Sequence, residues 1–322
     1  MFMGTPDFSV PTLKALAEGG YEIVGVYCQP DKEKGRGKQV QMPPVKMAAL
    51  ELGLPVFQPG TLKDEAVKEE LISLQPDIVV VIAYGKILPP WLIRLPKYGC
   101  INVHASILPK YRGAAPIHYA ILNGDTKTGV TIMHMDDGLD TGDILDIVET
   151  NIAPFETTGE LFERLADLGA QTINPVLEGW VKGEIRSIPQ DDTAATHTAK
   201  ITKEMGHIDW SKDGEDIANL IRGLNPAPGC YTYLNGTRLK IWFGNVIIAH
   251  NNIIEIDGDV VSVSGSEDPG TIIATVGGLL IATGNNSYLL ITEVQPENKK
   301  RMTAQDFING HQIKGGMAFD KG

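Results

Sequence analysis

Two polar residues at the end of an apolar run have the types and the spacing needed for acyl chemistry. The segment GCINVHASILPKYRG, residues 99–113, places Asn102 and His104 two positions apart. Side chains two apart on an extended strand share a face, so the amide and the imidazole are predicted to point the same way. An amide N–H can stabilise an oxygen that gains negative charge, and an imidazole can also move a proton.

A loop rich in carboxylates follows further along the chain. The segment MDDGLDTGD, residues 135–143, contains Asp136, Asp137, Asp140 and Asp143. Aspartates on such loops also form ordinary solvated turns, and a lone histidine at a strand end is often structural. A loop after an antiparallel strand can fold over the end of the strand that carries His104, where a carboxylate would favour the protonated ring. Together, the three groups predict an acyl-transfer site without a covalent nucleophile.

Apolar runs that alternate with helical patterns are expected to position these groups. Almost continuously apolar stretches, typical of buried parallel strands, occur at residues 21–28, 76–85 and 98–104. Apolar residues spaced by about 3.6 positions, typical of helices, occur between them at 11–20, 45–54 and 64–74. This βαβ order predicts an α/β fold with a Rossmann-like open parallel sheet. Such sheets bind ligands at the carboxyl ends of their strands, near a topological switch point.

A hairpin is expected to hold the aspartate loop. Residues 129–135 and 143–150 have strand-like patterns on either side of it. A long helix is predicted after them over residues 157–183, where Thr-Gly-Glu forms an N-terminal helix signal.

The predicted sheet lacks the glycine fingerprint of nicotinamide-dependent enzymes. Residues 3–11, MGTPDFSVP, contain one glycine where the pattern G-x-G-x-x-G would cradle a pyrophosphate. Dinucleotide binding is therefore disfavoured. The chain opens with MFMG, which leaves room for only the stub of a first strand, and we expect this to weaken the centre of the sheet.

The composition changes near residue 184 and indicates a second domain. Residues 184–203 are polar and irregular, as linkers are. Beyond them, alternating runs flank Asn235-Gly236, a strong hairpin signal, and more short strands follow. These strands predict a small β-barrel of the oligonucleotide-binding (OB) type, although a sandwich would give similar patterns. We therefore predict a catalytic domain over 1–183, a linker over 184–203 and an OB-like domain over 204–322.

The charge distribution bears on the partners of the protein. The formal net charge of −12 at pH 7 argues against long-range attraction to a polyanion. Basic residues nevertheless cluster within 28–48, within 97–113 and at Lys299, Lys300 and Arg301. Such clusters can hold phosphates at short range, and any one of them can equally be a solvated surface.

Other compositional features predict a cytosolic protein with reduced thiols. No apolar stretch is long enough for a membrane helix, and the N-terminus lacks the pattern of a signal peptide. The three cysteines, an odd number, are widely spaced and form no CxxC motif. Buried free thiols are therefore favoured over disulfides or a zinc site, and no metal is expected.

The motif around Asn102 and His104 resembles that of the formyltetrahydrofolate-dependent formyltransferases. INVHASILPKYRGAAPIH, residues 101–118, is similar to their Asn-x-His-x-Ser-Leu-Leu-Pro pattern, and Asp140, 36 positions after His104, matches their loop aspartate in GLDTGD. Further motifs, similar to those of the methionyl-tRNA formyltransferases within this family, include MGTPDFSVPTLKAL, VIAYGKILP, IDWSKDGEDIANLIRGLNP and KKRMTAQDFINGH. They cover nearly the whole chain, and several long motifs in order are far more specific than one.

This resemblance implies a reaction, a co-substrate and a partner. It implies transfer of a formyl group from 10-formyltetrahydrofolate to the free α-amino group of initiator methionyl-tRNA, giving N-formylmethionyl-tRNA for translation initiation. Asn102, His104 and Asp140 would be the catalytic residues. The folate would contact Ile82, Ala83, Tyr84, Gly85, Ile87, Ser106, Ile107, Leu108, Pro109, Asp137 and Gly138. The tRNA would contact Arg36, Lys38, Lys299, Lys300 and Arg301, and we expect a cytoplasmic monomer.

Two positions and one longer stretch depart from the family pattern. Ile107 stands where leucine is usual, Ala227 stands in NPAP where tryptophan is common, and the stretch 250–269 is longer than typical. None of them is one of the three expected catalytic residues.

Other functions make distinct predictions. A formyltransferase acting on a nucleotide-linked sugar amine or on glycinamide ribonucleotide would share the three catalytic residues, but should lack the C-terminal combination of IDW, RGLNP and KKRM. A nicotinamide oxidoreductase would show a cofactor-dependent absorbance change. An RNA-binding module with an inert first domain would bind RNA without turning over a formyl donor.

Overall fold

The computed structural model describes residues 1–34 and 39–320, which form two compact units. The first unit comprises Met1–Ile117, Lys127–Asn151 and Glu160–Ala199. The second comprises His118–Thr126, Ile152–Gly159 and Lys200–Gly322. The domain limits predicted from composition, 1–183 and 204–322 with a linker between them, stay a prediction.

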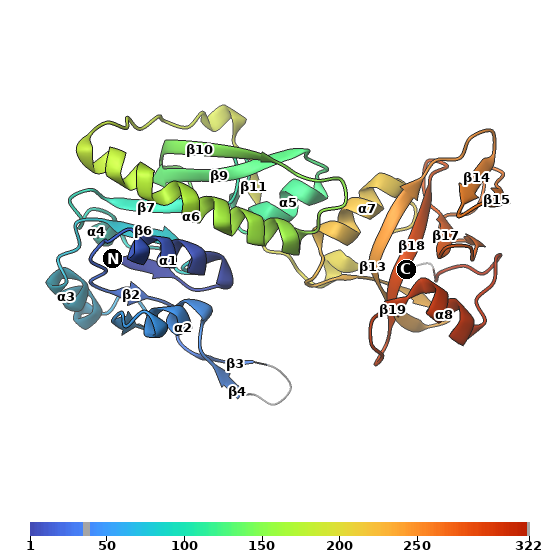
Figure 1. The fold of residues 1–322 in the computed structure, drawn as a ribbon, viewed down its shortest axis with the longest axis horizontal. Helices are drawn as coiled ribbons and strands as arrows, with labels where there is room; N and C mark the ends of the chain where they lie inside the picture. Colours follow the sequence, from blue (N-terminus) through green and yellow to red (C-terminus); the bar gives the residue numbers. More distant parts are fainter. Residues whose placement is uncertain (35–38, 321–322) are drawn as a thin grey trace. The chain divides into compact units, whose positions relative to one another are not determined.

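The first unit is built on a seven-stranded sheet with the order β10-β9-β7-β6-β1-β2-β5 (Figure 1). Its strands are β1 (Phe2–Gly4), β2 (Val26–Tyr27), β5 (Val56–Phe57), β6 (Val79–Ile82), β7 (Cys100–His104), β9 (Lys127–His134) and β10 (Asp143–Asn151). The five strands from β5 to β7 are parallel, whereas β9 and β10 are antiparallel additions beside β7. The predicted open, mostly parallel α/β sheet is confirmed.

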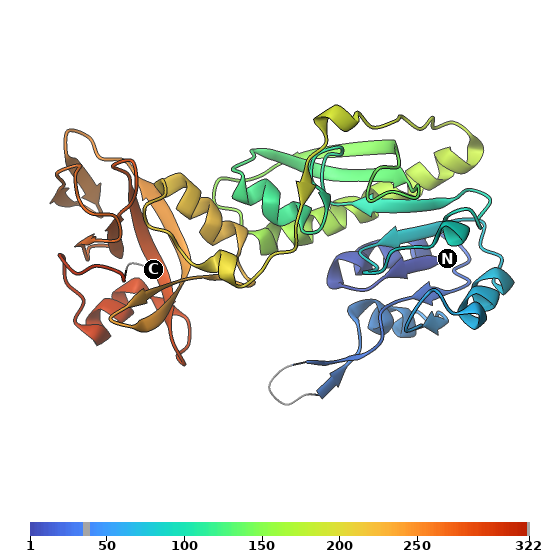
Figure 2. The same cartoon turned by 180° about the vertical axis from the view of Figure 1, so that it is seen from behind.

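Helices cover both faces of this sheet, as parallel strands require. They are α1 (Val10–Glu18), α2 (Pro44–Glu51), α3 (Glu65–Ser73), α4 (Pro90–Ile93) and α6 (Thr158–Lys182). A further helix, α5 (Pro116–Leu122), belongs to the second unit from His118 onward. Met3 and Val79 pack with Leu71 of α3 and Leu92 of α4 in one core. Helices α1 and α6 cover the face seen in Figure 1, and the opposite face is turned forward in Figure 2.

Short elements complete the first unit. They are the hairpin of β3 (Lys32–Lys34) and β4 (Gln39–Gln41), the pair of β8 (Arg112–Gly113) and β11 (His197–Thr198), and the 3-10 turns at Asp7–Ser9 and Asp192–Ala194.

The strand order creates a switch point at the centre of the sheet. From β1 the chain moves to β2 and β5 on one side, then returns to β6 and β7 on the other. Ligands of open α/β sheets bind at the carboxyl ends of the strands where the order reverses, here at β1 and β6. β1 holds this central position with only three residues, as the short opening of the chain predicts.

The second unit is an antiparallel half-barrel. Its sheet has the order β12-β13-β18-β17-β16, with β19 paired to β18. The elements are α7 (Gly214–Gly223), β12 (Cys230–Leu234), β13 (Thr237–Ile247), β14 (Ile253–Ile256), β15 (Asp259–Ser262), β16 (Ile272–Ala274), β17 (Leu279–Ala282), β18 (Tyr288–Pro296), β19 (Met302–Thr303) and α8 (Ala304–His311), with a 3-10 turn at Glu204–Gly206. Asn235 and Gly236 join β12 to β13 with φ values of 51° and 73°, so the predicted hairpin is confirmed.

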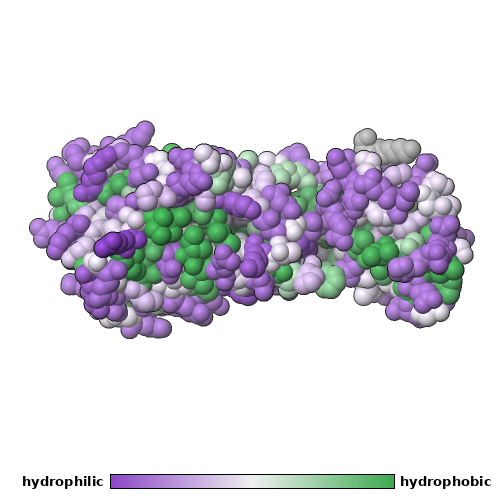
Figure 3. Space-filling model, turned by 90° about the horizontal axis from the view of Figure 1, so that it is seen from above, coloured by the Kyte–Doolittle hydropathy of each residue, from purple (hydrophilic) through white to green (hydrophobic). Residues whose placement is uncertain are grey.

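The helices and the cysteines can be compared with the predictions made from composition. No helix among the described residues is both long and apolar enough to cross a bilayer. The face seen in Figure 3 mixes hydrophilic areas with smaller hydrophobic ones on both units. Cys28, Cys100 and Cys230 are free and buried, as predicted. Burial raises the pKa of Cys28 to about 11 and those of Cys100 and Cys230 to about 12.

Candidate active site

Strand β7 carries the amide and the imidazole on one side of the sheet. Residues alternate along the strand, and Val103 faces α6, where an added Cβ on Gly169 would lie 2.9 Å from its Cγ1. Asn102 and His104 therefore point to the opposite face. The register of β7 is fixed from both sides, because Asn102 pairs with Val81 of β6 and Met133 of β9.

The ring of His104 is buried and held at one nitrogen. Only 8% of the side chain is exposed. Its Nε2 lies 3.0 Å from the carbonyl oxygen of Tyr111. Because a carbonyl can only accept, Nε2 carries a proton and donates it to this bond. Nδ1 is thereby left to face Asp140, whose Oδ2 lies 3.8 Å away.

The carboxylate of Asp140 is fixed by the main chain. The N–H of Gly113 donates to its Oδ2 at 2.7 Å, and the side chain is 16% exposed. Asp140 adopts the left-handed conformation, with φ of 54°, which aspartate tolerates better than most residues. The loop is further stiffened by Asp136, whose Oδ1 accepts from Gly138 N at 3.0 Å and from Thr141 Oγ1 at 2.7 Å. The structure thus brings two residues 36 positions apart to one place.

The amide of Asn102 has one N–H and its carbonyl oxygen without a hydrogen bond to the described residues. Its Nδ2 donates to the carbonyl oxygen of Val81 at 3.1 Å, which uses one of two N–H bonds. Its Oδ1 is buried and has no hydrogen-bond partner among the described residues. A buried polar atom without a partner is costly, so such an atom in a native site often serves a ligand.

The segment after β7 is fixed by hydroxyl groups. Ser106 is fully buried and its Oγ donates to Lys110 O at 2.7 Å. Thr131 Oγ1 donates to Ser106 O at 2.6 Å and accepts from Leu108 N at 3.0 Å. Ile107 and Pro109 are half-buried beside them. All four residues of this segment, 106–109, are predicted folate contacts.

The other predicted folate segment follows β6 at the switch point. The carbonyl oxygen of Tyr84 accepts from Thr5 Oγ1 and from Gln29 Nε2, both at 3.0 Å. The Tyr84 ring is buried, its hydroxyl has no partner among the described residues, and burial raises its pKa. Ile87 is 89% exposed, so it contributes nothing to the packing of the core. Of the remaining members, Ile82 ends β6, and Ala83 and Gly85 flank Tyr84 in the turn that follows.

Asp137 and Gly138 lie on the aspartate loop itself. Asp137 Oδ2 forms an exposed ion pair with Arg94 Nη2, at the end of α4. At Gly138 an added Cβ would lie 2.0 Å from Thr141 Oγ1, so a side chain there would displace the Thr141 hydroxyl that donates to Asp136.

Several groups that hold the catalytic residues in place could not be predicted from the sequence. The Tyr111 carbonyl and the Gly113 N–H are main-chain groups, which leave no trace in a sequence. Arg112 belongs to a basic cluster in the sequence, yet it is only 3% exposed. Its guanidinium donates to Gln190 and to Asp192, within the stretch that composition marks as a linker. The short motif YRG, residues 111–113 of the segment that also carries His104, is the available signal in the sequence.

The predicted tRNA-binding residues differ in their surroundings. Lys299 and Lys300 are exposed between β18 and β19, and neither forms an ion pair within the described residues. Arg301 is paired with the carboxylate of Glu293, and its guanidinium carbon lies 5.0 Å from the centre of the Trp242 ring. Arg36 and Lys38 lie outside the described residues.

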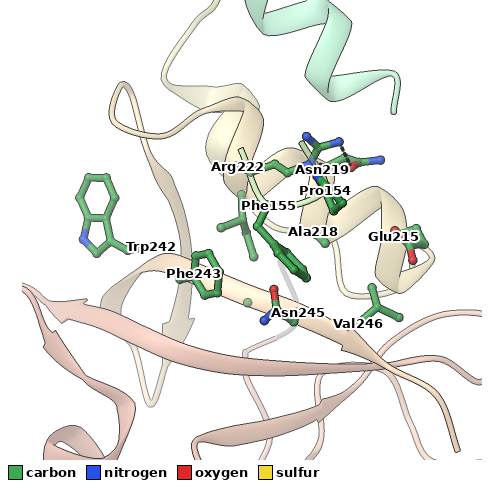
Figure 4. Close-up of a pocket in the computed structure, with 12 residues that line it drawn as sticks. Pro154, Phe155, Glu215, Ala218, Asn219, Arg222, Trp242, Phe243, Asn245 and Val246 are labelled. Atoms are coloured by element: carbon green, nitrogen blue, oxygen red, sulfur yellow. Dashed lines mark hydrogen bonds between the residues drawn. The ribbon is translucent and has the colours of Figure 1, made fainter. Parts of the chain in front are cut away.

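A cavity of about 270 Å³ lies within the second unit, and none of the predicted site residues lines it. Figure 4 shows Phe155 and Phe243 facing each other in it, with ring centres 6.4 Å apart. The Arg222 guanidinium donates to Asn219 Oδ1 at 2.8 and 2.9 Å. Among the described residues no group of three or more His, Cys, Asp or Glu side chains could hold a metal ion.

Family comparisons cover nearly the whole chain. The formyl transferase family matches residues 1–177, and the formyl transferase C-terminal domain matches residues 200–312. A methionyl-tRNA formyltransferase of Bacillus subtilis is 46% identical over 317 residues, which are 98% of this chain and 96% of the relative. One of Halalkalibacterium halodurans is 48% identical over 311 residues, covering 96% and 94%.

Solved structures with the same fold are more distant in sequence. WlaRD, a sugar 3N-formyl transferase solved with 5-N-formyl-THF, has a TM-score of 0.62 at 18% identity and covers 93% of this chain and 97% of its own. An N-formyltransferase of Helicobacter canadensis, solved with folinic acid and dTDP-3-aminofucose, has a TM-score of 0.63 at 19% identity, covering 92% and 98%. These two support the fold, and the closer relatives define the branch. The chain therefore belongs to the methionyl-tRNA formyltransferases of the formyl transferase family.

Proposed function

We propose that the protein transfers the formyl group of 10-formyltetrahydrofolate to the α-amino group of initiator methionyl-tRNA, with Asn102, His104 and Asp140 as its catalytic residues. The observation that carries this assignment is the approach of His104 Nδ1 to Asp140 Oδ2, 3.8 Å apart on separate elements. The ring and the carboxylate are each anchored by a main-chain group, so their approach is built into the fold.

The first chemical step forms a bond between the α-amine nitrogen and the formyl carbon. The formyl oxygen then becomes negatively charged in a tetrahedral intermediate. Asn102 has an unused N–H bond, and protonated His104 has Nδ1–H, so both can donate to this oxygen. The carboxylate of Asp140 lies 3.8 Å from Nδ1, so it faces the side of the ring that would donate.

The second step breaks the bond between the formyl carbon and N10 of the folate. The ammonium formed by attack must lose a proton, and the departing nitrogen must gain one. Asp140 is the carboxylate next to His104, so it can accept the amine proton, directly or through water. The products are N-formylmethionyl-tRNA and tetrahydrofolate.

The folate site is proposed at the switch point of the sheet. The end of β6 with the turn 83–87 and the segment 106–109 after β7 form two parts of this site, and the aspartate loop supplies Asp137 and Gly138. A pterin needs apolar walls and main-chain hydrogen-bonding groups, which buried segments of this kind offer. The exposed side chain of Ile87 is available to lie against a ligand there.

The tRNA site is proposed to use exposed basic side chains. Lys299 and Lys300 in the second unit are free to neutralise phosphates, and Arg36 and Lys38 are assigned the same role from the family resemblance. Phosphate contacts of this kind make binding strongly dependent on salt. A cytoplasmic monomer is part of the proposal, and light scattering coupled to size exclusion tests the monomer.

The decisive experiment is a formyl-transfer assay with purified protein and 10-formyltetrahydrofolate. We expect mass spectrometry to find a formylated amino acid after methionyl-tRNA is supplied, and none with uncharged tRNA or free methionine. An amino sugar such as dTDP-3-aminofucose serves as the competing acceptor. Formylation of the sugar in place of methionyl-tRNA would overturn the proposal.

A further inference from the structure

The side chain of Gln190, which is not one of the catalytic residues, connects the aspartate loop to Arg112. Gln190 Nε2 donates to the carbonyl oxygens of Asp140 at 2.9 Å and of Gly142 at 2.7 Å. Its Oε1 accepts from Arg112 Nε at 3.1 Å and from Nη2 at 2.8 Å. All four hydrogen bonds join segments that are distant in sequence, so the amide acts as a clamp on the aspartate loop.

The segment at the other end of the clamp supports both catalytic partners. Tyr111 O accepts from His104 Nε2, and Gly113 N donates to Asp140 Oδ2. Arg112 lies between these two residues, and its main-chain N donates to Thr196 O at 2.8 Å. Residues 111–113 therefore set the positions of the ring and of the carboxylate together.

Arg112 makes this segment rigid. Its side chain is almost fully buried, and a buried guanidinium is tolerated only when its N–H groups have partners. Gln190 Oε1 provides two of those hydrogen bonds, and Asp192 Oδ1 provides another at 2.7 Å. The acceptor of Gln190 thus serves the segment 111–113, while its donor serves the aspartate loop.

The neighbourhood of Gln190 is held in place by the main chain. Ile188 and Ile144 exchange two N–H···O bonds of 2.8 Å each, which tie residues 187–190 to the start of β10. Ser187 Oγ also donates to Asp143 Oδ2 at 2.8 Å. The amide is therefore presented to the loop by a fixed backbone.

We propose that Gln190 is a positioning residue for formyl transfer, which holds Asp140 at its working distance from His104. This inference rests on the proposed function, because the clamp affects the rate only if Asp140 takes part in formyl transfer. A displacement of a reacting group by about 1 Å can cost about 100-fold in rate. Loss of the clamp is therefore expected to lower kcat by about tenfold to 100-fold.

Two substitutions separate the donor from the acceptor of this amide. Gln190→Ala removes both. Gln190→Glu keeps an acceptor for Arg112 but places a carboxylate against two carbonyl oxygens, so it tests the donor in a protein whose buried arginine stays paired. We expect both variants to lower kcat while the KM values for folate and methionyl-tRNA stay close to wild type, because the amide positions a catalytic group and binds neither substrate. Gln305→Ala, which removes an exposed glutamine amide of the second unit, is the matched control with near-wild-type kcat.

A double-mutant cycle with Asp140→Asn tests the route of the effect. If Gln190 acts through Asp140, Gln190→Ala adds little to the loss already caused by Asp140→Asn. Equal fold losses in both backgrounds, wild-type kcat in both Gln190 variants, or a change confined to KM would overturn the inference. Full activity of Asp140→Asn itself would instead overturn the proposed catalytic residues, so the two failures are distinguishable.

Discussion

The two units hold their functional residues in opposite ways. In the first, the imidazole of His104 and the carboxylate of Asp140 are buried, and each is fixed by a hydrogen bond to the main chain. In the second, Lys299 and Lys300 project from a turn. Buried groups that are held by hydrogen bonds suit catalysis, because the reacting atoms must be placed accurately. Exposed flexible charges suit binding to a phosphate backbone.

Because of this contrast, substitutions in the two units are expected to change different quantities, the turnover rate and the affinity for tRNA. Substitutions within the first unit's site should act on kcat. Substitutions of the exposed lysines should act on tRNA binding and its salt dependence.

The largest effect is expected at the amide and the imidazole. Asn102→Ala and His104→Ala should each lower kcat by about 10²–10³, the usual cost of losing one donor to an oxyanion. Steady-state formyl-transfer kinetics measure the change, and circular dichroism checks that the variants fold. His250→Ala, an exposed histidine in the second unit, is the control. Near-wild-type turnover in both site variants would remove them from the mechanism.

The next effect concerns salt. Lys299→Ala with Lys300→Ala should raise KM for methionyl-tRNA without lowering kcat. The slope of log affinity against log salt should fall by about one for each phosphate that the variant no longer neutralises. Titrations of tRNA binding at several salt concentrations measure the slope. The exposed Lys63 of the first unit offers a control substitution, and an unchanged slope in the double variant would assign tRNA binding elsewhere.

Arg301 should matter less than its lysine neighbours. Its charge is already engaged by Glu293 and its guanidinium lies over Trp242. Arg301→Ala should therefore reduce the salt slope by less than the removal of one free lysine does. Glu293→Gln provides the converse, because it frees the arginine and should tighten tRNA binding. Equal effects of Arg301→Ala and Lys300→Ala would show that tRNA breaks this ion pair.

The smallest expected effect is on the native thiols. Burial raises the pKa of Cys28 in the first unit to about 11 and that of Cys230 in the second to about 12, so neither forms thiolate at neutral pH. A thiol reagent should leave both unmodified in the folded protein. On titration with denaturant, mass spectrometry of the labelled peptides reports which unit opens first. Rapid labelling without denaturant would contradict the burial of these residues.

Much of the first unit could be predicted from local pattern. The apolar run of β7 and the spacing of Asn102 and His104 follow from periodicity, and the family motif identifies Asp140. The hydrogen bonds of Gln190 could not be predicted, because they join positions 48 to 78 residues apart through main-chain carbonyls and one guanidinium. Likewise, a cluster of Lys299, Lys300 and Arg301 looks uniform in sequence, and only the fold shows that Glu293 pairs with one member.

The bond between His104 Nε2 and the Tyr111 carbonyl has a consequence for proton traffic. Because Nε2–H donates to the main chain, only Nδ1 can exchange a proton with a substrate. The ring therefore cannot relay a proton from one nitrogen to the other. Whatever proton it gives at Nδ1 it must recover at Nδ1. The proton that the attacking amine loses must then go to N10 of the departing folate or to water. It cannot pass through the His104 ring to the main chain of the sheet.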